Sequence, residues 1–120
     1  MCKLVKWDND RQIADIKYNH IMNITKQAEK CKNINRIMLF GSSLEERCTA
    51  RSDIDIAVFG NQSKASYLRS KEYRNFRNQV FLYDLNQDYD ILYFVDGKKQ
   101  EDLIMNDINQ GVEIFRREAV

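Results

Sequence analysis

The chain has 120 residues, of which 43% are hydrophobic and 31% are charged, and this length and composition suit one compact domain over residues 1–120 and exclude a disordered tail. Nineteen basic and eighteen acidic side chains leave a net charge of +1. No global field therefore recruits nucleic acid or a membrane surface, and any phosphate binding must be local.

The first half of the chain predicts a helix followed by a strand. Residues 8–31 open with three capping-type residues and then repeat apolar residues near helical spacing, which indicates an amphipathic helix. The run Arg36–Phe40 is short and mainly apolar, and it stops at Gly41, as a buried strand does. The polar segment Ser42–Arg47 predicts one or two helical turns directly after the glycine.

The second half alternates strands with helices. Residues 53–59 predict a second strand, and residues 63–80 repeat aromatic and apolar side chains at the spacing of a long helix. A third strand is expected over residues 89–95. A helix over residues 100–109 then precedes a last extended segment at residues 112–115. This alternation indicates an α/β (α+β) domain.

Two carboxylates share one face of the second predicted strand. Successive side chains of a strand point to opposite faces, so Asp53 and Asp55 lie on one face while Ile54 and Ile56 lie on the other. Adjacent carboxylates repel each other unless a cation lies between them, which favours a hard divalent ion. Mg²⁺ fits this pair, because it binds one or two carboxylates together with waters and substrate phosphates.

The turn after the first predicted strand is suited to binding phosphate. Gly41 would let the backbone approach a phosphate closely, and the amides and hydroxyls of Ser42 and Ser43 at a helix start would bind its oxygens. The alternative is that Asp53 and Asp55 are solvated residues on an exposed sheet face and that the glycine only makes a turn. The order of the elements favours the site over this alternative.

A third carboxylate is expected from the third strand. Asp90 lies at its beginning and, by the period of two, shares a face with Asp88. One of the two can reach the same cluster from a neighbouring strand.

Together these segments resemble the nucleotidyltransferase superfamily that includes DNA polymerase beta, and especially its smallest bacterial and archaeal members, the minimal nucleotidyltransferases. Members have an apolar strand, Gly-Ser, a polar stretch, Asp-x-Asp in an apolar strand, and later one more acidic residue on a third strand. In this sequence the matching positions are Gly41, Ser42, Asp53, Asp55 and, as our choice for the last, Asp90. The closing segment Ile108–Phe115 is also similar to the helix end and final strand of the small members. The resemblance covers nearly the whole chain.

The resemblance implies a nucleotidyltransferase fold, in which a small mixed β-sheet is flanked by helices. It also implies transfer assisted by two Mg²⁺ ions, with Mn²⁺ as the alternative metal. Asp53 and Asp55 would hold both ions, and Asp90 would hold one and favour deprotonation of the attacking hydroxyl. The nucleoside triphosphate, which we expect to be ATP, would lie against Gly41 and Ser42.

One position departs from the family pattern. Many minimal members have an arginine directly after Gly-Ser, whereas this chain has Ser43, so a phosphate contact is missing or moved. Arg47 or Arg51 is a candidate to replace it.

The resemblance also implies a protein acceptor. Minimal members of this length resemble antitoxins that adenylylate a HEPN-type toxin, so we expect transfer of AMP to a hydroxyl of such a partner, with a tyrosine as the preferred acceptor. An aminoglycoside nucleotidyltransferase uses the same carboxylates but usually carries an extra helical domain. A catalytically silent module that neutralises its partner by contact alone is the other alternative, and the intact carboxylate set argues against it.

The remaining candidate residues suggest no further chemistry. Cys2, Cys31 and Cys48 are odd in number and widely spaced, which predicts reduced thiols and no zinc site. His20 lies inside the first predicted helix, far in sequence from the carboxylates, and is expected to be a packing or surface residue. No apolar run approaches the length of a membrane span or a secretion signal, so we expect a cytoplasmic protein without a membrane partner.

Overall fold

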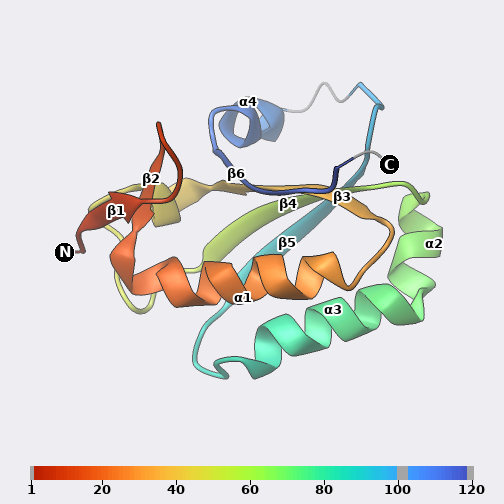
Figure 1. Ribbon diagram of the computed structural model, residues 1–120, viewed down its shortest axis with the longest axis horizontal. Helices are drawn as coiled ribbons and strands as arrows, with labels where there is room; N and C mark the ends of the chain where they lie inside the picture. The colour runs from red at the N-terminus through yellow and green to blue at the C-terminus, as the bar shows by residue number, and fades with distance from the viewer. Residues whose placement is uncertain (1, 100–102, 119–120) are drawn as a thin grey trace.

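The computed structural model describes residues 2–99 and 103–118, and its main sheet lies between two layers of helices (Figure 1). The sheet has four strands in the order β5-β4-β3-β6. These strands are β3 (Ile34–Phe40), β4 (Ile54–Gly60), β5 (Tyr89–Val95) and β6 (Val112–Arg116). β4 and β5 are parallel, while β3 is antiparallel to both β4 and β6. The fold is therefore a mixed α+β fold, and the fold-class prediction is confirmed.

Helices cover both faces of the main sheet (Figure 1). α1 (Tyr18–Glu29) and α3 (Lys71–Leu82) pack side by side, and the short α2 (Lys64–Arg69) precedes α3. α4 (Ile104–Asn109) covers the opposite face. The apolar spacing of α1 and α3 explains this arrangement, because their buried side chains recur on a single face of each helix.

The sheet separates two apolar cores, which explains the long apolar run in β4. Ile54, Ile56 and Val58 pack into the larger core beneath α1 and α3. Ala57 and Phe59 point the other way, into the smaller core that also contains Ile108 of α4. Because both faces of β4 are covered, most of the strand is apolar rather than alternating.

The first helix begins at Tyr18, whereas the sequence predicts that it begins at residue 8. Residues before it form a hairpin of β1 (Leu4–Lys6) and β2 (Gln12–Ala14), and a 3₁₀ turn at Asp15–Lys17 leads into α1. The Asp8 carboxylate accepts hydrogen bonds from the backbone N–H groups of Asp10 and Arg11, at 3.0 and 2.9 Å. Capping residues also stabilise tight turns, and here they close the hairpin.

The long helix predicted over residues 63–80 is two helices. Ser70 has extended backbone angles, and its hydroxyl accepts a hydrogen bond from the backbone N–H of Tyr73 at 3.1 Å. It therefore ends α2 and caps α3. The apolar spacing continues across Ser70, so periodicity alone does not reveal the break.

The other predicted elements are close to those observed. β3 begins two residues earlier than predicted, and β4 and β5 lie where the second and third strands are expected. The segment after β3 forms a 3₁₀ turn at Gly41–Leu44. Residues 100–102 of the last predicted helix lie outside the described residues. In the described part of the chain, none of the helices has both the length and the apolar character needed to span a membrane.

Candidate active site

The register of the sheet brings the predicted carboxylates to one end of three neighbouring strands. Phe40, the last residue of β3, pairs with Asp55 near the beginning of β4. Asp55 in turn pairs with Asp90 near the beginning of β5. Asp53 directly precedes β4. The end of β3 therefore lies beside the beginnings of β4 and β5, which carry all three carboxylates.

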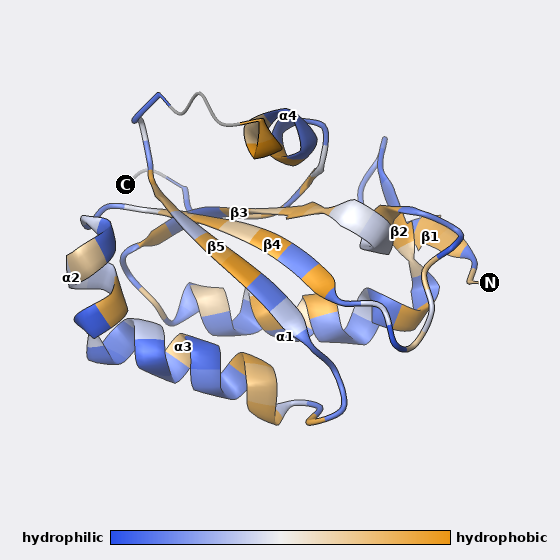
Figure 2. Cartoon of the chain, turned by 180° about the vertical axis from the view of Figure 1, so that it is seen from behind, coloured by the Kyte–Doolittle hydropathy of each residue, from blue (hydrophilic) through white to orange (hydrophobic). Residues whose placement is uncertain are grey.

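Asp55 and Asp90 lie on the face of the sheet that α4 covers. Ile54 and Ile56 are fully buried on the α1 side, so the alternation of β4 turns Asp55 to the α4 side, as the sequence predicts. The same alternation places Asp90 on the face of Leu92, which packs in the smaller core. Figure 2 shows a polar band near the beginning of both β4 and β5, within otherwise largely apolar strands.

The charges of Asp90 and Asp53 act on the carboxyl of Asp55. Burial raises the pKa of the Asp55 carboxyl, and the negative charges of Asp90 and Asp53 raise it further. Asp88 is not among the charges that act on this pKa. Of the two candidates on the third strand, Asp90 is the one that the fold brings to Asp55.

Gly41 touches this cluster through its backbone. Its φ of +79° lies in the left-handed region, which residues with a side chain avoid. A Cβ at this position would lie 2.3 Å from Oδ2 of Asp55. The turn thus requires glycine both for its conformation and for its approach to the carboxylate.

A cavity of about 400 Å³ opens at this point of the molecule. Gly41 and Asp55 line it together with other residues of the turn after β3 and of the α4–β6 region. These are Phe40, Leu44, Glu45, Arg47, Asp107 and Gln110. The cavity combines carboxylates, a guanidinium group and apolar side chains, which is the mixed lining of a ligand site.

Asp107 and Gln110 line the cavity but were not identified as site candidates from the sequence. Asp107 and Gln110 belong to the region of α4, and no local pattern relates them to Gly41 or Asp55. Arg47 was considered as a phosphate ligand and does line the cavity, where its guanidinium group pairs with the carboxylate of Glu45.

The two serines of the turn differ in accessibility. Ser42 is half-buried, whereas Ser43 is fully buried and its hydroxyl has no hydrogen-bond partner among the described residues. The structure therefore brings Gly41 to the cavity but not Ser43. Direct contact between Ser43 and a nucleotide would require the turn to move.

The donor set suits an ion that is completed by a substrate. Within residues 2–99 and 103–118, no three carboxylate, imidazole or thiol groups are arranged to hold a metal ion by themselves. Asp53, Asp55 and Asp90 interact, but they do not form a closed cage. Mg²⁺ commonly takes one or two carboxylates and receives its other ligands from phosphates and water. The carboxylates present fit that mode of binding.

His20 and the cysteines are not among the residues that line this cavity. Nε2 of His20 lies 2.8 Å from Oδ2 of Asp84, and the imidazole packs edge-on against Tyr83. The three thiols are free, and burial raises the pKa of the Cys31 and Cys48 thiols. These contacts indicate packing roles.

Comparison with models of known protein families gives a match. The family model described as "Polymerase beta, Nucleotidyltransferase" matches residues 22–119. The matched span is most of the chain and contains the Gly41 turn and all three carboxylates. A search of curated proteins gives no significant match.

Proposed function

The chain belongs to the polymerase beta nucleotidyltransferase family, and from this premise we propose that it transfers AMP from ATP to a hydroxyl of a partner protein. The observation that carries this proposal is the register that sets Asp55 beside both Gly41 and Asp90. Transfer of a nucleotide needs phosphate binding, charge neutralisation and an activated hydroxyl. Gly41 could bind phosphate, Asp55 could hold the metal ion that neutralises charge, and Asp90 could orient the hydroxyl.

The chain's own residues have separate roles in this proposal. Asp53 and Asp55 would hold Mg²⁺, and Asp90 would share in holding it and orient the attacking hydroxyl by accepting its hydrogen bond. When bound, Mg²⁺ supplies positive charge that stabilises the attacking and leaving oxygens. A bond forms between the acceptor oxygen and the α-phosphorus, the bond from that phosphorus to pyrophosphate breaks, and the proton of the hydroxyl passes to the Asp90 carboxylate.

We also propose that Arg47 contacts the triphosphate. It lines the same cavity as Gly41 and Asp55, and the position after Ser42, where many minimal members have an arginine, is occupied by the buried Ser43. Glu45 pairs with Arg47, so a phosphate would compete with this carboxylate for the guanidinium group.

The size of the cavity favours a protein as the acceptor. About 400 Å³ is near the lower end of the range for ligand pockets, which leaves little room for a small second substrate beside a nucleotide. A side chain presented on another protein needs no enclosed pocket. The partner we propose is a HEPN-type toxin, and the acceptor a tyrosine hydroxyl, which makes the chain an antitoxin.

A silent binding module is the second candidate function. The observations that favour it are the burial of Ser43 and the absence of a preformed three-ligand metal group among the described residues. Such a protein would neutralise its partner by contact alone.

Intact-mass spectrometry separates the two functions. With ATP, Mg²⁺ and the partner, the partner should gain the mass of one nucleotide monophosphate. The gain should be absent when Asp53 and Asp55 are both changed to Asn. A partner that is neutralised equally well by the double variant, with no mass change in either mixture, would establish the binding module instead.

A further inference from the structure

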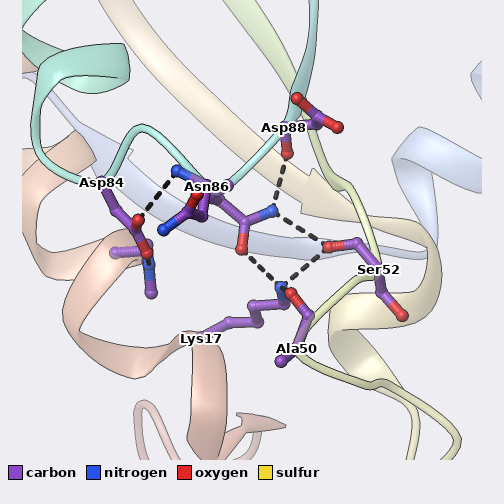
Figure 3. Close-up of polar contacts among 8 residues, drawn as sticks. Lys17, Ala50, Ser52, Asp84, Asn86 and Asp88 are labelled. Carbon is purple, nitrogen blue, oxygen red and sulfur yellow. Dashed lines mark hydrogen bonds and ion pairs between the residues drawn. The ribbon is translucent and has the colours of Figure 1, made fainter.

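A lysine is fully buried behind the carboxylate cluster. Lys17, at the end of the 3₁₀ turn before α1, is only 1% exposed. Its ammonium group donates hydrogen bonds to the backbone oxygens of Ala50 and Ser52, at 3.3 and 2.8 Å, and to the side-chain oxygen of Gln87. Figure 3 shows the ammonium group pointing toward Ala50 and Ser52. All three hydrogens of the ammonium group can therefore be used.

Gln87 extends this network to the next strand. Its side chain is buried, and its amide nitrogen donates to the backbone oxygens of Ser52 and Asp88, at 3.0 and 2.7 Å. The same oxygen of Asp88 accepts the backbone N–H of Ile54 at 3.0 Å. We call these contacts of Lys17 and Gln87 the Lys17–Gln87 network.

The network connects the beginnings of the two strands that carry the carboxylates. Ser52 directly precedes Asp53, and Asp88 lies two residues before Asp90. The oxygens of Ser52 and Asp88 are both bound by the amide nitrogen of Gln87. The relative position of Asp53 and Asp90 therefore depends on a buried side-chain bridge as well as on the β4–β5 hydrogen bonds.

Burial of this ammonium group is unfavourable for folding on its own. Burial lowers the pKa of Lys17, and the nearby charges of Cys48, Asp53 and Asp84 only oppose that shift. An apolar side chain at a buried position usually serves stability at least as well as a buried charge. A role beyond stability explains why a lysine occupies this buried position. The oxygens that accept its hydrogen bonds indicate what that role is.

We propose that Lys17 is a positioning residue for nucleotidyl transfer, which with Gln87 holds the beginnings of β4 and β5 so that Asp53 and Asp55 stand beside Asp90. This inference rests on the proposed function of the three carboxylates. Lys17 contacts neither substrate nor metal. It acts through the backbone oxygens that precede the carboxylates.

The test uses the full-length protein and two variants, Lys17→Met and Gln87→Leu. The probe is Mn²⁺ alone, with free Mn²⁺ measured by electron paramagnetic resonance. Groups that orient metal ligands from behind typically change metal affinity 10- to 100-fold when removed. We therefore expect each variant to bind Mn²⁺ at least about tenfold more weakly than wild type.

Two further variants separate position from charge and from stability. Gln87→Glu keeps the acceptor for Lys17 but loses both donated hydrogen bonds, so it should weaken Mn²⁺ binding although the ammonium group stays paired. Arg117→Ala is the matched control. Arg117 donates hydrogen bonds to the backbone oxygens of Ala28, Cys31 and Ile34, at the opposite end of β3 from Gly41. Its loss should lower stability and leave Mn²⁺ affinity unchanged.

A metal-free measurement keeps this inference separate from the proposed function. Amide hydrogen exchange at Ile54, whose N–H binds the oxygen of Asp88, should accelerate in Lys17→Met and Gln87→Leu by more than their loss of global stability explains, whereas in Arg117→Ala it should change only with global stability. Wild-type Mn²⁺ affinity and Ile54 exchange in both network variants would overturn the inference, and Lys17 would then serve only the fold. If wild type binds no Mn²⁺ while the exchange result holds, the metal-centred function fails and the bridge between β4 and β5 stands. If Lys17→Met does not fold, Gln87→Leu and Gln87→Glu decide the outcome.

Discussion

At the scale of single residues, Gly41 links backbone geometry to the carboxylates. Gly41→Ala should lower the free energy of unfolding by more than the 1–2 kcal/mol or so that left-handed backbone costs an alanine, because the new Cβ also displaces the Asp55 carboxylate. Gly97→Ala is the control, since Gly97 has φ +84° with no atom near its Cβ position. Urea unfolding measures both. Equal decreases in the free energy of unfolding of the two variants would show that displacement of the Asp55 carboxylate does not destabilise the fold.

We expect the Asp55 carboxylate to lower the stability of the fold although it is needed for Mg²⁺-dependent binding of ATP. Without metal at neutral pH, Asp55→Asn should raise the free energy of unfolding by on the order of 0.5 kcal/mol, because the amide removes a charge that burial, Asp90 and Asp53 disfavour. The value is small since the carboxylate is half exposed. The same variant should lose Mg²⁺-dependent binding of ATP.

The pH dependence of this difference follows from the raised pKa of Asp55. Wild type is penalised only while the carboxyl is charged, so the two proteins should converge as the pH falls through that pKa. Urea unfolding at neutral and acidic pH, with calorimetry for ATP, checks both parts. Asp88→Asn is the control and should bind ATP normally, because the β4–β5 register sets Asp90 and not Asp88 beside Asp55. A less stable Asp55→Asn at neutral pH would contradict the prediction.

At the scale of elements, Ser63 caps α2 and Ser70 caps α3, where the apolar periodicity predicts a single helix. Ser70→Ala should lower the free energy of unfolding by about 1 kcal/mol, the usual effect of losing an N-cap. Ser63→Ala should lower the free energy of unfolding by less than Ser70→Ala. The reason is that α2 buries only Tyr67 whereas α3 buries Tyr73, Phe76 and Val80. Mg²⁺-dependent ATP affinity should not change in either, since both helices lie on the face away from α4. An equal or larger loss for Ser63→Ala in urea unfolding would argue against this reasoning.

The boundaries of elements also show why local signals are ambiguous. The residues around Asp8 satisfy the rules for a helix start, yet the structure uses them to close the β1–β2 hairpin. A helix start and a hairpin turn both need a short side chain that accepts hydrogen bonds from backbone N–H groups. Only the pairing of β1 with β2, which is a contact between separate segments, decides between them.

At the scale of the whole molecule, the site lies where three strands and α4 meet. The apolar cores on both sides of the sheet hold β4 rigidly, so Asp55 projects from a strand and not from a loop. Asp107 of α4 lines the cavity that Asp55 also lines. A site on a rigid sheet with one helix above it suits a reaction that depends mainly on positioning.

The sequence by itself determined the features that depend on neighbours along the chain. Asp55 points to the opposite face from Ile54 and Ile56 because side chains alternate in any strand, and β5 lies where its apolar run predicts. The tertiary structure alone decided what depends on contacts between distant segments. The parallel register selects Asp90 over Asp88, the packing of the turn buries Ser43, and the loops around Ser52 and Gln87 enclose Lys17. Periodicity and capping are local, whereas strand register and burial arise only when the sheet assembles.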